Sequence, residues 1–178
     1  MNLANKLTLS RIVLIPFYIL LFLLDFKYHY YYAVAVFILA SITDYVDGRI
    51  ARNRNMITTF GKFADPLADK MLVAASLLCF MSIGRIGVWA LFIILAREFA
   101  VTGLRAAVAA NGVVLAAGMW GKAKTFAQMI GLIYLHFEVA ASIKYAVIGD
   151  VLVYIMVILT LISGIEYFYK NRMSIQLK

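Results

Sequence analysis

Long apolar stretches alternate with short polar ones along the whole chain. A membrane-spanning helix needs about 20 mostly apolar residues, and on this pattern we predict six such helices. They cover residues 11–25, 31–50, 66–83, 86–109, 122–142 and 147–169. Residues 1–10 are predicted to lie along the membrane surface. The pattern therefore predicts an all-α, polytopic integral membrane protein, with one domain over residues 1–178.

Composition supports a membrane protein and argues against several soluble classes. Hydrophobic residues make up 65% of the 178 residues and charged residues 15%, whereas soluble domains are about 45–50% apolar. A globule of this size has too little interior to bury so much apolar surface. A soluble enzyme and a disordered tail are therefore excluded. The single cysteine, Cys79, also excludes a scaffold held by intrachain disulfides.

The basic residues predict how the chain is oriented. With the N-terminus inside the cell, most of the 17 lysines and arginines fall at the cytoplasmic ends of the six spans, and only Lys27, Arg85 and Lys144 fall outside. This bias follows the positive-inside rule, so the net charge of +8 needs no nucleic-acid partner. We expect a multi-pass protein of the cell membrane with both termini in the cytoplasm.

Four of the nine acidic residues lie close together in the sequence, between the second and third predicted spans. They are Asp44, Asp47, Asp65 and Asp69. Residues three or four apart on a helix differ by about 40–60° in direction, so each pair lies on one face of its helix. Carboxylates facing lipid are costly. We therefore expect all four to face a polar cavity.

Such a cluster of carboxylates is suited to binding metal ions. Closely packed carboxylates repel one another, and oxygen ligands favour hard divalent cations such as Mg²⁺ or Mn²⁺. The alternative is that these acids only pair with nearby arginines and lysines, and the spacing leaves that alternative open. Asp65 directly before Pro66 predicts the N-cap of the third span.

Residues 44–69 resemble a known family. They read DYVDGRIARNRNMITTFGKFADPLAD, which is similar to the signature D-x2-D-G-x2-A-R-x8-G-x3-D-x3-D of the CDP-alcohol phosphatidyltransferases. All fixed positions are present: Asp44, Asp47, Gly48, Ala51, Arg52, Gly61, Asp65 and Asp69. The resemblance implies a six-helix membrane enzyme in which an alcohol attacks a CDP-lipid and CMP leaves.

The resemblance also implies a role for each matched residue. Asp44, Asp47 and Asp65 would ligate two divalent cations, and Asp69 would act as the general base with a metal contact as well. The CDP-lipid would lie against Gly48, Ala51, Arg52 and Gly61. The family resemblance implies a homodimer too.

Three further stretches, residues 5–11, 97–105 and 121–128, resemble the branch of that family that works with CDP-diacylglycerol and sn-glycerol 3-phosphate. Ala4 departs from that branch, which often has proline there. A phosphomonoester acceptor needs a cationic pocket, and the candidates for it are Arg97, Arg105, Lys122 and Lys124. The plainer reading of the two lysines is positive-inside charge. Arg97 and Glu98 are adjacent and, on helix geometry, are not expected to form a pair.

Two other functions compete with this one. The first is the same chemistry with another acceptor, such as inositol phosphate. The second is a small divalent-cation transporter that uses the four aspartates as its ion site. Transporters often repeat their ion site in an inverted second half, and the sequence contains no second acidic cluster.

Overall fold

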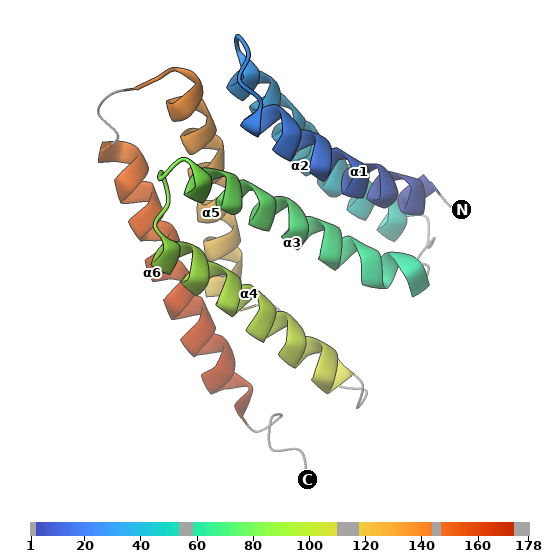
Figure 1. Ribbon diagram of the computed structural model, residues 1–178. Helices are drawn as coiled ribbons and strands as arrows, with labels where there is room; N and C mark the ends of the chain where they lie inside the picture. Colours follow the sequence, from blue (N-terminus) through green and yellow to red (C-terminus); the bar gives the residue numbers. More distant parts are fainter. Residues whose placement is uncertain (1–2, 54–58, 110–117, 144–146, 173–178) are drawn as a thin grey trace. The chain divides into compact units, whose positions relative to one another are not determined.

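The computed structural model describes residues 3–53, 59–109, 118–143 and 147–172, and side chains only from residues 9–43 and 67–109 in the first two of these ranges. Within them the chain forms six helices and no strand (Figure 1). The helices are α1 (Leu3–Leu23), α2 (His29–Asn53), α3 (Thr59–Ser82), α4 (Val88–Ala109), α5 (Met119–Ala140) and α6 (Val147–Lys170). The predicted all-α class with six helices is confirmed.

Two helix starts differ from the prediction by more than three residues. Helix α1 begins at Leu3 and includes Pro16, so most of the predicted surface segment is the first part of that helix. Helix α3 begins at Thr59, and the prediction of Asp65 as an N-cap is therefore wrong. Pro66 is the eighth residue of α3, and its nitrogen cannot donate the helical hydrogen bond.

The described chain divides into two compact units, and the first contains α1, α2 and α3. Unit 1 takes in Met1–Ile83 and Leu135–Ile143, so the end of α5 belongs to it. The His136 side chain is 1% exposed, and a hydrogen bond of 2.9 Å joins its Nε2 to the Tyr18 hydroxyl. The ring centroids of Phe37 and Phe80 each lie 4.8 Å from that of His136. This aromatic cluster fixes the end of α5 in the core of unit 1.

Unit 2 takes in Gly84–Tyr134 and Lys144–Lys178, and it contains α4, most of α5 and α6. Helices α4 and α6 lie side by side and run in the same direction (Figure 1). Near their N-terminal ends, Arg85 Nη1 donates a 2.6 Å hydrogen bond to Asp150. Gly131 lets α5 approach α6 closely, because a Cβ there would lie 2.8 Å from the Met156 sulfur. The polar network described below is held between these three helices.

Apolar side chains also cover much of the outside of the helices. Trp89, Phe126 and Ile165 are 77%, 70% and 71% exposed, whereas soluble proteins rarely expose large contiguous apolar surface. Among the described residues, α6 alone is long and apolar enough to cross a membrane, with a mean hydropathy of 2.3, and Leu9–Leu23 and His29–Thr43 are shorter apolar segments. Charged residues inside α4 and α5 lower their hydropathy. The six spans therefore remain a prediction.

Candidate functional site

The acidic motif lies on two helices of unit 1. Helix α2 carries Asp44 and Asp47, and α3 carries Asp65 and Asp69. Since all four lie on helical backbone, the spacings of three and four residues place each pair on one face, as predicted. The predicted lipid-binding positions Gly48, Ala51 and Arg52 on α2, and Gly61 on α3, lie on the same two helices.

Asp69 is the member of this motif whose side chain falls within the described part of the chain. It is exposed, and its neighbour Ala68 and the next-turn residue Leu72 are 0% and 4% exposed. The buried face of α3 therefore holds the helix in unit 1, while Asp69 lies off that face. Exposure gives a carboxylate access to a substrate hydroxyl.

The other seven motif side chains, those of Asp44, Asp47, Gly48, Ala51, Arg52, Gly61 and Asp65, lie outside the described residues. Searching the described residues alone gives no group of three or more potential metal ligands, and three of the four predicted ligands were not part of that search. The structure shows that the four aspartates lie on helical backbone, three residues apart on α2 and four apart on α3. All are hard oxygen ligands, which fits Mg²⁺ or Mn²⁺.

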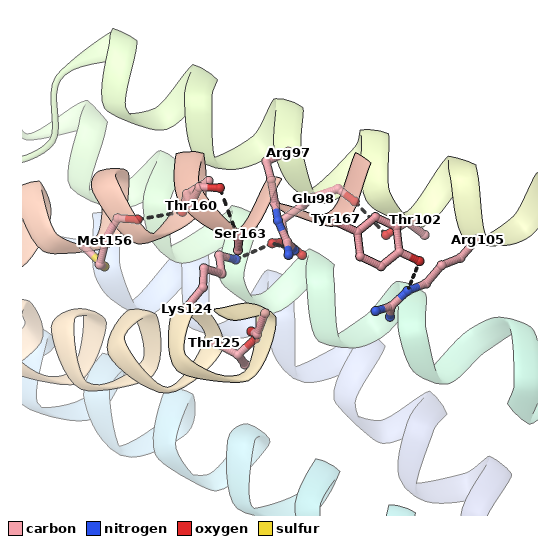
Figure 2. A network of polar contacts seen from close by, with 11 residues as sticks. Arg97, Glu98, Thr102, Arg105, Lys124, Thr125, Met156, Thr160, Ser163 and Tyr167 are labelled. Atoms are coloured by element: carbon pink, nitrogen blue, oxygen red, sulfur yellow. Dashed lines mark hydrogen bonds and ion pairs between the residues drawn. The ribbon is translucent and has the colours of Figure 1, made fainter. Parts of the chain in front are cut away.

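A separate polar network lies inside unit 2, centred on Glu98 of α4 (Figure 2). Its Oε1 accepts hydrogen bonds from Lys124 Nζ on α5 and, at 3.2 Å, from Arg97 Nη1. The three side chains are 17%, 4% and 14% exposed, in the order Glu98, Lys124 and Arg97. One carboxylate thus holds two of the four predicted phosphate-binding cations in place.

This contact corrects the expectation that Arg97 and Glu98 would not pair. Successive residues point about 100° apart on a helix, yet both side chains are long and reach toward Lys124 on α5 (Figure 2). One glycine leaves room for the arginine. A Cβ at Gly164 would lie 3.3 Å from Arg97 Cγ, which is a tight contact, whereas one at Gly121 would make an ordinary van der Waals contact, 3.6 Å from Arg97 Nη2.

The remaining two cations lie apart from Glu98. Arg105 Nε donates a 3.0 Å hydrogen bond to the Tyr167 hydroxyl, and its guanidinium lies 5.2 Å from the centre of that ring. Lys122, in the first turn of α5, is exposed. Arg97 and Lys124 are therefore brought together, while Arg105 is anchored separately by α6.

Sequence reasoning left open whether Glu98 is structural or orients a neighbouring arginine, and it missed Gly164 and Tyr167 as parts of this arrangement. Glu98 carried a detectable signal, because a carboxylate inside an apolar helix requires a polar partner. Gly164 and Tyr167 carried none, since a glycine and a tyrosine near the end of an apolar helix have many ordinary roles.

The buried position of Lys124 leads to a prediction about stability. Glu98→Gln is expected to lower the free energy of unfolding by about 3 kcal/mol, because it leaves a buried ammonium without its carboxylate. The measurement is a denaturant titration of the protein in detergent micelles.

The control is Glu166→Gln, which removes the carboxylate of the pair with Lys170, a side chain that is 64% exposed. Such a pair contributes about 0.5 kcal/mol or less. If Glu98→Gln cost no more than this control, Glu98 would not be the anchor of the network.

The whole sequence is similar to proteins of one known family. The sequence model of the CDP-alcohol phosphatidyltransferase family matches residues 1–162. The chain is 44% identical to the CDP-diacylglycerol–glycerol-3-phosphate 3-phosphatidyltransferase of Bacillus subtilis, over 96% of this chain and 95% of that protein. The protein of the same name from Rickettsia typhi is 39% identical, over 94% and 95%.

A third relative, the probable phosphatidylglycerophosphate synthase of Mycobacterium tuberculosis, is 38% identical over 93% of this chain and 79% of that protein. The similarity therefore extends through both compact units. It includes the acidic motif as well as the helices that carry the polar network.

Proposed function

This chain belongs to the CDP-alcohol phosphatidyltransferase family, and from that premise we propose that it transfers a phosphatidyl group from CDP-diacylglycerol to sn-glycerol 3-phosphate. The products are CMP and phosphatidylglycerophosphate, a step of phospholipid biosynthesis. The observation that carries the proposal is the nearly full-length identity of 44% to a relative named for this reaction.

The reaction needs a base and a site for the diphosphate. A hydroxyl of glycerol 3-phosphate attacks the phosphorus that bears diacylglycerol, the bond from this phosphorus to the CMP oxygen breaks, and the hydroxyl proton passes to Asp69. The exposed position of Asp69 supports this assignment. Arg52 would hold phosphate with two parallel hydrogen bonds, and the small residues Gly48, Ala51 and Gly61 would leave space for the nucleotide.

We propose that Asp44, Asp47, Asp65 and Asp69 hold two divalent cations, Mg²⁺ or Mn²⁺. When bound, such a pair of cations neutralises a diphosphate and stabilises the leaving oxygen. The helical spacing of the four carboxylates supports this ligand set.

The acceptor is held by its phosphate group in this proposal. The positive charge comes from Arg97, Arg105, Lys122 and Lys124. Glu98 accepts hydrogen bonds from both Arg97 and Lys124 and so holds these two cations close together. Because these cations are already fixed in position, less conformational entropy is lost when a phosphate binds. An uncharged acceptor would gain little from such a cluster.

Arg105 provides a test of acceptor binding. Arg105→Ala is expected to raise the KM for glycerol 3-phosphate about tenfold, because a hydrogen bond between two charged groups is lost. The KM for CDP-diacylglycerol should change much less. Initial rates of CMP release with each substrate varied in turn provide the measurement.

The matched control is Arg85→Ala, which removes an arginine that pairs with Asp150 near the other end of α4. Both KM values should stay close to those of the unaltered protein. A rise confined to the KM for CDP-diacylglycerol in Arg105→Ala would assign Arg105 to the donor site instead.

The overall activity is tested by an acceptor screen. Purified protein in detergent, with CDP-diacylglycerol and Mg²⁺, should release CMP with glycerol 3-phosphate and far more slowly with inositol phosphate or serine. Faster release with inositol phosphate would reassign the acceptor within the family. Absence of CMP release with every acceptor would refute the proposed reaction.

We further propose that all six helices span the cell membrane, with both termini and the active site on the cytoplasmic side, and that the two units form one membrane domain. The apolar helix α6 and the exposed apolar side chains of the other helices support this placement. A homodimer is the assembly that we expect for the family.

A further inference from the structure

A groove runs between α4 and α6 within unit 2. Its volume is about 660 Å³. Small residues on both helices, Ala96, Ala100 and Gly164, leave the space, and Phe92 and Phe168 border it. Apart from two arginines, the lining consists of apolar and aromatic side chains and this glycine, and it contains no acidic residue. An acyl chain suits such a lining.

The length of the groove matches one leaflet of a membrane. The lining extends from Leu161 on α6 to Arg172, two residues beyond the end of that helix, and at 1.5 Å per residue this is about 16 Å. The hydrocarbon core of a bilayer is about 30 Å thick, so that one leaflet contributes about 15 Å. A single phospholipid chain would therefore fill the groove along its length.

The charge in the groove is positive. Arg172 lines the C-terminal end of the groove, with its guanidinium 4.6 Å from the centre of the Tyr169 ring. Arg97 also lines the groove, and its buried Nε has no hydrogen-bond partner among the residues that the structure describes. The end near Arg172 is the end that we place at the cytoplasmic surface. A headgroup with a net negative charge complements these arginines, whereas a zwitterionic headgroup would bring an ammonium close to them.

We propose that this groove binds one anionic phospholipid of the cytoplasmic leaflet, with its phosphate at Arg172 and one acyl chain between α4 and α6. The proposal rests on the membrane placement given above. The occupant is a lipid of the bilayer and not the CDP-linked donor, because the donor diphosphate is proposed to need the carboxylates of the acidic motif, and no acidic residue is among the described residues that line the groove. The bound lipid would contact Arg97 from the groove, while Glu98 contacts its guanidinium.

The test is photo-crosslinking in vesicles. The purified protein is reconstituted with a trace of phosphatidylglycerol or phosphatidylcholine, each carrying the same diazirine-labelled acyl chain. Labelled peptides are quantified by mass spectrometry. Phosphatidylglycerol should label residues 92–100 and 161–172 about fivefold more than phosphatidylcholine does, the preference expected from one arginine near an anionic headgroup.

Two pairs of variants separate the contribution of the Arg172 charge to lipid preference from the contribution of the groove to labelling. Arg172→Gln should reduce labelling by phosphatidylglycerol to the level of phosphatidylcholine, whereas Lys170→Gln removes the same charge from an exposed residue outside the lining and should leave the preference intact. Ala100→Trp fills the groove and should abolish labelling by both lipids. Ala106→Trp, on an exposed position of α4 outside the lining, is its control.

Several results would overturn the proposal. Equal labelling by both lipids in the unaltered protein would mean ordinary contact with surrounding lipid. No labelling by either lipid would mean that a second copy of the chain covers the groove. Loss of labelling on adding excess CDP-diacylglycerol would assign the groove to the donor. Circular dichroism establishes that each variant is folded, and CMP release from the unaltered protein tests the proposed reaction separately.

Discussion

Replacing Asp69 with asparagine is expected to lower the turnover number by about 10²–10⁴, the usual contribution of general acid–base catalysis. Asparagine keeps the size of the side chain and can still form hydrogen bonds, but it cannot accept the proton of the attacking hydroxyl. Binding of CDP-diacylglycerol should change much less, because we assign donor recognition chiefly to Arg52 and the metal-binding carboxylates. The measurement is the rate of CMP release at saturating concentrations of both substrates and of Mg²⁺.

The matched control is Asp150→Asn, which removes the carboxylate that pairs with Arg85 at the start of α6. Its turnover should stay near that of the unaltered protein. Because Asp69 is also a proposed metal ligand, Mn²⁺ affinity is measured on the same variant. Near-normal turnover of Asp69→Asn at saturating Mg²⁺ would mean that another group takes the proton.

Removal of divalent cations is the second change with a large expected effect. Excess EDTA should abolish CMP release, and added Mg²⁺ or Mn²⁺ should restore it, because four ionised carboxylates and a diphosphate cannot share one site without positive charge. Asp44→Asn, Asp47→Asn and Asp65→Asn should each weaken Mn²⁺ binding by at least about 10–100-fold, the loss seen when even outer-shell groups are removed.

Binding is measured directly, by electron paramagnetic resonance of Mn²⁺ titrated into the protein without substrates. Asp150→Asn again provides the control, since it lies on α6 and outside the motif. Full activity in excess EDTA would rule out the two-metal site. Unchanged Mn²⁺ affinity in all three variants would remove those residues from the ligand set even if their activity fell.

The sequence predicted the helices better than their ends. Apolar stretches of sufficient length determine where a helix forms, and α4 and α6 match their predicted ranges to within two residues. The start of α3 was misplaced because Pro66 was read as an N-terminal signal. A proline is also tolerated within a helix where neighbouring groups compensate for the missing hydrogen bond, and the local sequence does not distinguish the two cases.

The candidate site was predictable to different extents in its two parts. The helical placement of the four aspartates could be predicted, because the spacing within each pair is that of a single helix, while their meeting in one metal site stays a prediction. The network around Glu98 joins α4 to α5, and its partner Lys124 is 26 residues away in the chain. Local spacing contains no information about which side chains of separate helices meet, so the contact between Glu98 and Lys124 was missed. The contact between Arg97 and Glu98 was not expected because adjacent helix positions point about 100° apart, and the two long side chains overcome that difference.

On the proposal that α4 spans the membrane, the same contact affects how the chain enters it. Insertion scales assign about 2.5–3.5 kcal/mol to a charged residue at the centre of a helix, and α4 carries two such residues side by side. Arg97 and Glu98 contact each other at 3.2 Å within one helix, so this pair needs no later helix in order to form. Lys124 belongs to α5, which is synthesised afterwards, and its partner Glu98 is then already present. On this proposal, the order of synthesis allows each of these three charges to find a partner as soon as its own helix is inserted.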